Sequence, residues 1–150
     1  MVTTPLSLKG RALRLLSARE HSRVELERKL GQYEEEPGAL AKALDDLQAK
    51  GFINEQRVVD SVLNRRSAKL GTARIRQELQ GKGLAPEAVL GAVEQLRATE
   101  VERAREVWRR KFGEPPADAA ERGKQMRFLA SRGFDGDAIR RVVAGSSDDD

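Results

Sequence analysis

The sequence predicts an all-α protein, built as an elongated tandem array of three helix-turn-helix-like repeats of three helices each. One observation is a pattern that occurs three times: Leu, two residues, a basic residue, Gly, then Phe or Leu, starting at Leu47, Leu79 and Leu129. A second is that apolar residues recur at helical spacing, and no segment alternates with the period of a β-strand over a useful length. The third is the composition, 39% hydrophobic and 35% charged, which is typical of helical repeats with thin cores.

Each copy of the pattern has the chemistry of a helix end followed by a helix start. A Gly just past a helix adopts the left-handed conformation that closes the C-terminus, and the apolar residue after it packs on the last turn. The basic residue suits the negative end of the helix dipole. An acidic residue after each Gly (Glu55, Glu87 and Asp137) suits the positive end of the next helix. We therefore expect Gly83 and Gly133 to have positive φ angles.

Nine helices account for the apolar spacing. In chain order they are predicted near residues 6–18, 22–30, 37–50, 55–70, 72–82, 86–98, 100–112, 118–132 and 136–144. They form three repeats in residues 1–50, 51–98 and 99–150, the last with a short acidic tail. The middle helices of repeats two and three align, because Leu79 and Leu129 stand 50 residues apart. Repeat one departs from this scheme, since its middle helix leads into an acidic turn at residues 32–37 instead of the pattern.

Capping signals set the ends of these helices. Three segments fit a capping box, the last in a looser acidic form: Ser22–Glu25, Thr99–Glu102 and Asp118–Glu121. Two prolines stand where a proline in the first helical turn is expected, Pro37 and Pro86. Three more glycines are predicted as helix stops: Gly31, Gly71 and Gly113.

The charge distribution predicts an anionic partner. The net charge is +4, and the segment from Arg57 to Lys82 holds seven basic residues against two acidic ones. From Arg122 to Arg132 there are four basic residues and no acidic one. Such helices would line an electropositive groove, although solvated helix faces carry similar charges. The predicted binding residues are Arg57, Arg65, Arg66, Arg74, Arg76, Lys82, Lys124, Arg127 and Arg132.

No constellation of catalytic or cofactor-binding residues stands out. The chain has no Cys and a single His, His21, which we expect to pack beside a helix start or lie exposed. Phosphate-binding and nucleophile-elbow motifs are absent, and the carboxylates of residues 34–36 favour a solvated turn over a Mg²⁺ site. Trp108 and Tyr33 are expected to pack. We predict no enzyme activity, no cofactor, no membrane span and a cytoplasmic protein.

Several segments together resemble the RecX family, bacterial regulators of the RecA recombinase. Each is weak alone, but their order and spacing from about Leu8 to Ala144 are fairly specific. They are Arg11-Ala-Leu-Arg-Leu-Leu-Ser-Ala-Arg19 with His21-Ser22 and Glu25-Leu26, Gly51-Phe-Ile-Asn-Glu55-x-Arg57, Gly71-x-x-Arg74-Ile75-x-x-Glu78-Leu79-x-x-Lys82-Gly83, and Lys124-x-x-Arg127-Phe128-Leu129-x-x-Arg132-Gly133-Phe134. The acidic turn at 32–37 departs from the family pattern.

The resemblance implies a monomeric array of three-helix repeats that binds along the groove of the RecA–single-stranded DNA filament. It also implies inhibition of ATP hydrolysis, strand exchange and the co-protease role, and thus a part in recombination, DNA repair and the SOS response. On this reading Arg66, Arg74 and Lys82 belong to the contact surface of the middle repeat, and Arg127 and Arg132 to that of the last.

Two other functions remain open from the residues alone. The first is a stand-alone basic helical DNA-binding protein, because Thr72, Arg74, Arg76 and Gln77 begin a helix that could enter a groove of DNA. The second, more remote, is a nuclease with a carboxylate metal site. A filament regulator should bind RecA-coated DNA more tightly than bare DNA, a DNA-binding protein should show the reverse, and a nuclease should cut DNA with Mg²⁺.

Overall fold

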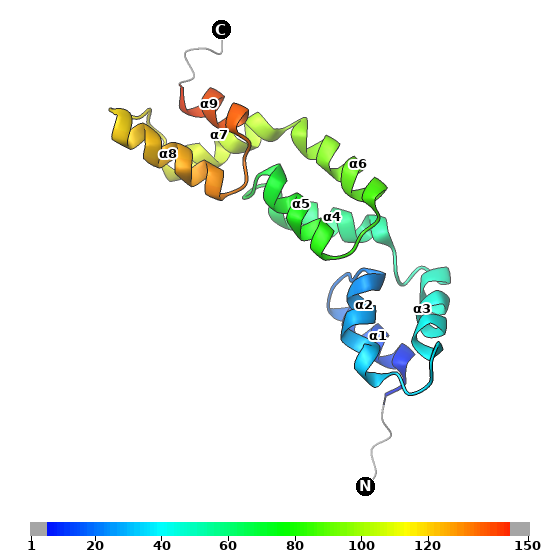
Figure 1. Ribbon diagram of the computed structural model, residues 1–150. Coiled ribbons are helices and arrows are strands. Elements are labelled where there is room, and N and C mark those ends of the chain that lie inside the picture. Colours follow the sequence, from blue (N-terminus) through cyan, green and yellow to red (C-terminus); the bar gives the residue numbers. More distant parts are fainter. Residues whose placement is uncertain (1–5, 145–150) are drawn as a thin grey trace.

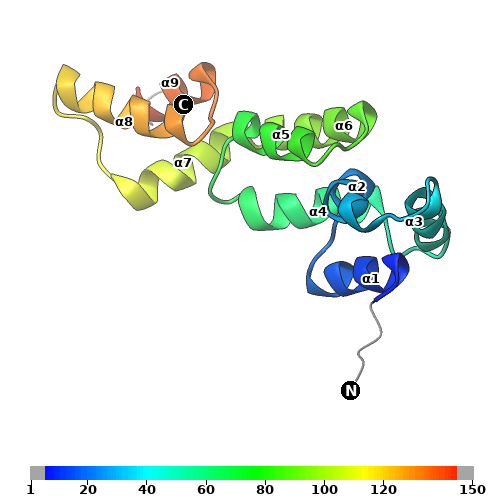
Figure 2. The ribbon, with the colours of Figure 1, turned by 60° about the horizontal axis from the view of Figure 1, so that its bottom comes forward.

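The computed structural model describes residues 6–144, and within that range the chain is all-α. The elements in order are α1 (Leu8–Ala18), α2 (Arg23–Leu30), a 3₁₀ turn η1 (Gly31–Tyr33), α3 (Ala39–Ala49), α4 (Glu55–Arg66), α5 (Thr72–Gly81), α6 (Pro86–Arg97), α7 (Glu100–Lys111), α8 (Ala119–Ser131) and α9 (Gly136–Val143). Figure 1 shows three helix triplets in a row, and Figure 2 shows the same elongated arrangement from another side. The predicted all-α repeat array is confirmed.

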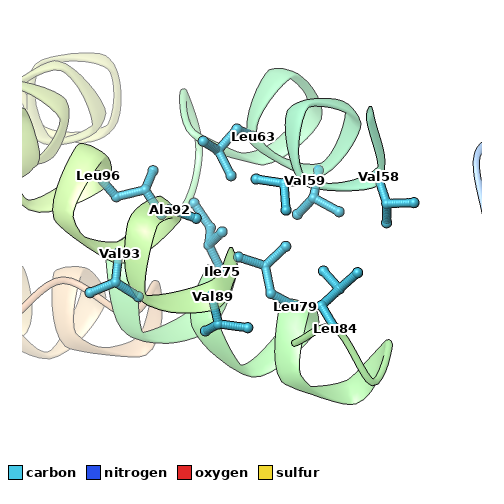
Figure 3. Packing of buried hydrophobic residues seen from close by; sticks show 11 residues of the cluster. Val58, Val59, Leu63, Ile75, Leu79, Leu84, Val89, Ala92, Val93 and Leu96 are labelled. Carbon is cyan, nitrogen blue, oxygen red and sulfur yellow. The ribbon is translucent and has the colours of Figure 1, made fainter. Parts of the chain in front are cut away.

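Each triplet buries its own apolar side chains. One cluster lies in α1–α3 and includes Ile53, a second lies in α4–α6, and a third lies in α7–α9. In the second cluster, side chains of α4, α5 and α6 converge, with Leu79 fully buried between the helices (Figure 3). Because each core is small, the contacts that join the triplets matter for the shape of the whole chain.

The predicted glycine caps are confirmed. Gly51, Gly83 and Gly133 have φ angles of 85°, 69° and 93°. The N–H of Phe134 donates back to the carbonyl of Leu129, the hydrogen bond of a Schellman ending. Phe134 is buried, whereas Phe52 is 47% exposed because it stands in the link between two triplets. Acidic residues occupy the first turns of α4, α6 and α9, as the pattern predicted.

Other cap predictions divide into correct and wrong ones. Ser22 and Glu25 form the complete capping box of α2, Asp118 accepts the N–H of Glu121, and Pro86 is in the first turn of α6. Gly113 ends α7 at a φ of 73°. The capping box at Thr99 is wrong, because its ψ of 13° is not the extended conformation that a cap requires. Its hydroxyl donates to the carbonyl of Leu96 instead.

Two further predictions, at Pro37 and Gly71, also need correction. Pro37 is not in a helix, since α3 begins after Gly38, whose φ is 88°, and the carboxylate of Glu34 accepts the N–H of Leu40. Gly71 begins α5 in an extended conformation rather than ending a helix. Gly31 is the C-cap of α2, as predicted, although its φ of −54° is right-handed and η1 follows directly.

The middle helices of neighbouring triplets meet end to end. The N–H of Gly71, at the start of α5, donates to the carbonyl of Arg132 at 2.8 Å, and the N–H of Ala73 donates to that of Gly133 at 3.2 Å. At the other junction, the hydroxyl of Ser22, at the start of α2, donates to the carbonyl of Lys82. The unpaired carbonyls at the ends of α8 and α5 thus accept hydrogen bonds from donors at the starts of α5 and α2. At each junction the two helix dipoles are therefore aligned head to tail.

Side chains strengthen both junctions in equivalent ways. Arg74 Nη1 donates to the carbonyl of Ser131 at 2.8 Å, and Arg28 Nη1 donates to that of Gly81 at 2.7 Å. In residues 6–144 the end of α2 receives no such contact, and it is also the middle helix without the basic–Gly–apolar pattern. On α5 and α8 the pattern therefore marks the docking end of a middle helix, which explains why repeat one departs from it.

Candidate functional site

Three of the nine predicted binding residues hold the fold together. Arg57 Nε donates to Glu20 at 2.9 Å, and its Nη2 donates to the carbonyl of Gly51 at 2.7 Å, so it secures the link between the first two triplets. Arg74 belongs to the junction described above. Lys82 Nζ lies 3.4 Å from Glu25 across the other junction, and its side chain is only 13% exposed. These three charges are largely occupied within the molecule.

Two predicted residues share one acidic partner. Arg65 and Arg66 lie 3.4 Å and 3.1 Å from the carboxylate of Glu78. Their side chains remain 48% and 43% exposed, and one carboxylate balances only one of the two charges. This pair therefore leaves a net positive charge at the surface between α4 and α5.

The other four predicted residues are exposed. Within the described residues, no hydrogen bond or ion pair occupies the side chains of Arg76, Lys124 and Arg127. Arg132 lies over the ring of Phe128, with its Cζ 4.8 Å from the ring centre. Arg76 is on α5 and the other three are on or just after α8, so free positive charge is present on the middle helices of the last two triplets.

A buried carboxylate that the sequence did not reveal joins the last two triplets. Glu100 is 3% exposed. Its Oε1 accepts from the N–H of Thr72 at 3.1 Å and from Arg103 Nη2 at 2.8 Å, and its Oε2 accepts from the N–H of Asp135 at 3.1 Å. One side chain thus ties the start of α5 to the turn before α9. An acidic residue beside a helix start carries no signal of such burial in the sequence.

Arg103 is also structural rather than part of a binding surface. Its Nη1 donates to the carbonyls of Ser67 and Leu70 and so holds the loop between α4 and α5. Helix α4 ends at Arg66, earlier than predicted. Burial lowers the pKa of Arg103, while the charge of Glu100 acts in the opposite direction. Residues 103–111 hold five basic residues, and this segment therefore contributes fewer surface charges than its composition suggests.

Glu25 has a matching role at the first junction. Burial would raise its pKa, but hydrogen bonds from Arg19 and the N–H of Ser22, with the charge of Lys82, outweigh burial and lower the pKa to about 2. The neighbouring His21 is 2% exposed, as expected for a packed residue, and burial lowers its pKa. Its ring nitrogens contact the carbonyl of Arg19 and the amine of Lys29.

The aromatic residues expected to pack differ in burial. Trp108 lies against the third core and donates to Gln125 at 2.8 Å, whereas Tyr33 is 42% exposed, with Arg11 3.8 Å above its ring centre. Over residues 6–144, no group of three or more His, Cys, Asp or Glu side chains could hold a metal ion. No helix in that range is long and apolar enough to cross a membrane. What the described surface offers chemically is positive charge for binding.

Comparison with known proteins agrees with the motifs. Residues 9–47 match the family described as RecX, first three-helix domain, and residues 98–143 match RecX, third three-helix domain. Regulatory protein RecX of Leptothrix cholodnii is 56% identical over 138 residues, covering 92% of this chain and 88% of that protein. The chain belongs to the RecX family. A second RecX protein, from Ralstonia nicotianae, is 46% identical, covering 95% of this chain and 89% of its own.

Solved RecX structures share the fold. A crystal structure of regulatory protein RecX has a TM-score of 0.71 at 19% identity and covers 96% of this chain and 82% of its own. RecX from Lactobacillus salivarius has a TM-score of 0.75 at 19% identity and covers 91% of this chain and 92% of its own. At that identity the likeness establishes the fold, a helical RecX array. The relatives named above are called regulatory proteins, and what they regulate bears on the proposal below.

Proposed function

We propose that this RecX family member is a non-enzymatic, cofactor-free regulator that binds the RecA–single-stranded DNA filament. It acts as a monomer in the cytoplasm and inhibits ATP hydrolysis, strand exchange and the co-protease role of the filament. It thereby restrains recombination, DNA repair and the SOS response. The contact surface is the exposed part of the predicted basic set: Arg65, Arg66, Arg76, Lys124, Arg127 and Arg132.

The observation that carries this proposal is free positive charge on an extended array. Arg76, Lys124 and Arg127 have no ion pair within residues 6–144, and they lie on two triplets joined end to end. An extended body of this kind can contact neighbouring subunits of a filament at once, so several weak contacts add to one strong attachment. Binding across subunits blocks their movement without any chemistry of its own.

A stand-alone DNA-binding protein is the alternative. The start of α5, whose Thr72 and Arg74 were candidates for base contacts, does not favour it. Thr72 is buried against Glu100, and Arg74 contacts the end of α8. A recognition helix must present its first turns to a groove, and these turns are covered by the neighbouring triplet.

Binding with and without RecA tests the proposal. Labelled single-stranded DNA, alone or coated with RecA and a non-hydrolysed ATP analogue, is titrated with the protein, and RecA-driven ATP hydrolysis is followed in parallel. We expect tighter binding to the coated strand and inhibition of hydrolysis. Tighter binding to bare DNA would instead support the alternative, and Mg²⁺-dependent cleavage of the DNA would overturn both.

A further inference from the structure

A hollow of about 300 Å³ opens at the junction of the last two triplets. Ala68 and Lys69 line it from the loop after α4, and Val107, Arg110 and Lys111 line it from α7. Phe128 and Arg132, at the end of α8, complete it. The hollow exists only because the second and third triplets dock, since its walls come from both. It has an apolar floor and a cationic rim.

The charges on the rim are poorly balanced. Lys69 has no ion pair or hydrogen bond from its side chain within residues 6–144. Lys111 Nζ and Arg132 Cζ lie 5.3 Å and 4.8 Å from the ring centre of Phe128, and no acidic side chain of the described chain is within ion-pair distance of either. Arg110 is 3.9 Å from Glu106, but that carboxylate already holds Arg109 at 2.8 Å. Among the described residues, four cations thus share at most part of one carboxylate.

The ring of Phe128 already has other side chains close to it. Arg132 and Lys111 lie near it, and Phe112 meets it edge to face with the ring centres 5.5 Å apart. A base-binding platform needs a free aromatic face, and these three neighbours compete with a base for this ring. What stays accessible is apolar surface at Ala68, Val107 and Phe128, surrounded by positive charge. Protein interfaces use this combination to hold one apolar anchor between complementary charges.

We propose that the hollow binds an acidic protein segment that inserts one apolar side chain between the four cations. This inference rests on the proposed function in one respect, namely that the acidic segment belongs to a RecA subunit of the filament. The carboxylates on either side of the anchor neutralise Lys69, Arg110, Lys111 and Arg132. The attachment fails when the hollow is filled or its rim loses charge.

A defined peptide tests the binding chemistry without RecA. The probe is a fluorescein-labelled peptide with one central Leu between pairs of Glu, and its anisotropy is followed on titration with the full chain at low salt. Two comparison peptides carry Gly for Leu or Gln for Glu. We expect both to bind more weakly than the probe. Equal binding of all three peptides would overturn the proposal.

Two variants locate the site. Ala68→Trp fills the hollow and keeps every charge, and Lys69→Ala with Arg110→Ala keeps the space and removes two charges. The double variant should weaken peptide binding by roughly tenfold, about what two exposed ion pairs contribute. Ala68→Trp should also weaken it, because the apolar side chain of the peptide can no longer enter the hollow. The matched control is Arg14→Ala with Lys42→Ala, two exposed residues of the first triplet whose side chains have no partner in the described chain. This control should bind the peptide like the parent, and circular dichroism melts check that each variant folds.

The outcomes separate this inference from the proposed function. We call Lys69→Ala with Arg110→Ala the rim variant. If it binds the peptide as tightly as the parent does, the inference is wrong, whatever the result for Ala68→Trp. A second outcome would also overturn the inference. If an oligothymidylate binds the parent but not the rim variant, and the peptide binds neither protein, the hollow is a nucleic-acid site. If the peptide binds as expected but the parent does not bind RecA-coated DNA, the hollow stands and the filament assignment fails.

Discussion

Val24 lies directly over Gly83, so that a Cβ added to Gly83 would be 2.6 Å from the Cβ of Val24. The equivalent contact at the next junction is Arg74 over Gly133, where an added Cβ would be 2.7 Å from the Cβ of Arg74. These glycines are required for two reasons: each closes a helix at positive φ, and each allows the neighbouring triplet to approach closely. On α5 and α8 the repeated sequence pattern is therefore a docking element as well as a helix cap.

Alanine at either docking glycine should destabilise the protein. Gly83→Ala and Gly133→Ala each add left-handed strain of about 1 kcal/mol, and the clash with the neighbouring triplet adds to it. Gly133→Ala should be the more damaging change, because the backbone N of Arg74 is 2.8 Å from its added Cβ and cannot rotate away. Thermal and urea unfolding of each variant measure the loss.

Gly91→Ala is the matched control for those two variants. Gly91 lies inside α6 with nothing within 4 Å of an added Cβ. There alanine should stabilise the helix by up to about 1 kcal/mol, because it removes the backbone entropy of glycine. If Gly83→Ala and Gly133→Ala unfold like Gly91→Ala, the docking role of the pattern is wrong.

Removing the charge of Glu100 should loosen the last junction. Glu100→Gln leaves Arg103 buried without its carboxylate and weakens the acceptor for the N–H groups of Thr72 and Asp135. Breaking a buried ion pair costs about 3–5 kcal/mol. Glu102→Gln, on the same helix but exposed and without a described partner, should change the unfolding free energy by less than about 0.5 kcal/mol. Equal stability of both variants would show that the Glu100 network is not needed.

The first junction should weaken in acid. The pKa of Glu25 is lowered from 4.5 to about 2 in the folded chain, so its carboxylate stabilises the fold fully above pH 4.5. That contribution falls as the pH drops from 4.5 towards 2, because the unfolded chain takes up the proton first. Glu25→Gln should therefore melt well below the parent at pH 6, and the gap should narrow at pH 3. A gap that stays constant with pH would mean that the charge of Glu25 does not matter.

Sequence patterns predicted features that depend on near neighbours. The glycine caps and the Ser22 box follow from residues a few positions apart, and these predictions were correct. Thr99 and Pro37 failed because their backbone conformations are set by the adjoining turns. The roles of Lys82 and Glu100 depend on partners in another triplet, Glu25 and Thr72, which are 57 and 28 residues away. No local pattern distinguishes a junction charge from a solvated one, so the binding set mixed both kinds.

Solution scattering should show the elongated shape. A compact globule of 150 residues would have a radius of gyration of roughly 15 Å. Three separate cores in a row, joined at helix ends, should give a clearly larger value for a monomer at low concentration (Figures 1 and 2). Gly133→Ala, which prevents close docking of the last triplet, should broaden the distance distribution. A value near the compact estimate would contradict the array in solution.

The exposed basic residues should carry the inhibition of RecA, and the junction residues should carry stability. Arg76→Ala, Lys124→Ala and Arg127→Ala together remove charges that have no partner in the described chain, so melting should hardly change. The concentration that half-inhibits RecA-driven ATP hydrolysis should rise on the order of tenfold at low salt, because three exposed ion pairs contribute roughly 0.2–1 kcal/mol each. The deficit should shrink as salt rises, since screening weakens the parent as well.

A second triple variant separates binding from folding. Arg66→Ala, Arg74→Ala and Lys82→Ala together remove one exposed charge and two junction contacts, so this variant should lose melting temperature along with inhibition. The first variant should lose inhibition alone, because its charges do not hold the triplets together. Arg14→Ala with Lys42→Ala again provides the control for lost positive charge. The opposite result would be a folded first variant that inhibits RecA as well as the parent does at low salt, together with a control that has lost inhibition. The contact surface would then lie on the first triplet rather than on α5 and α8.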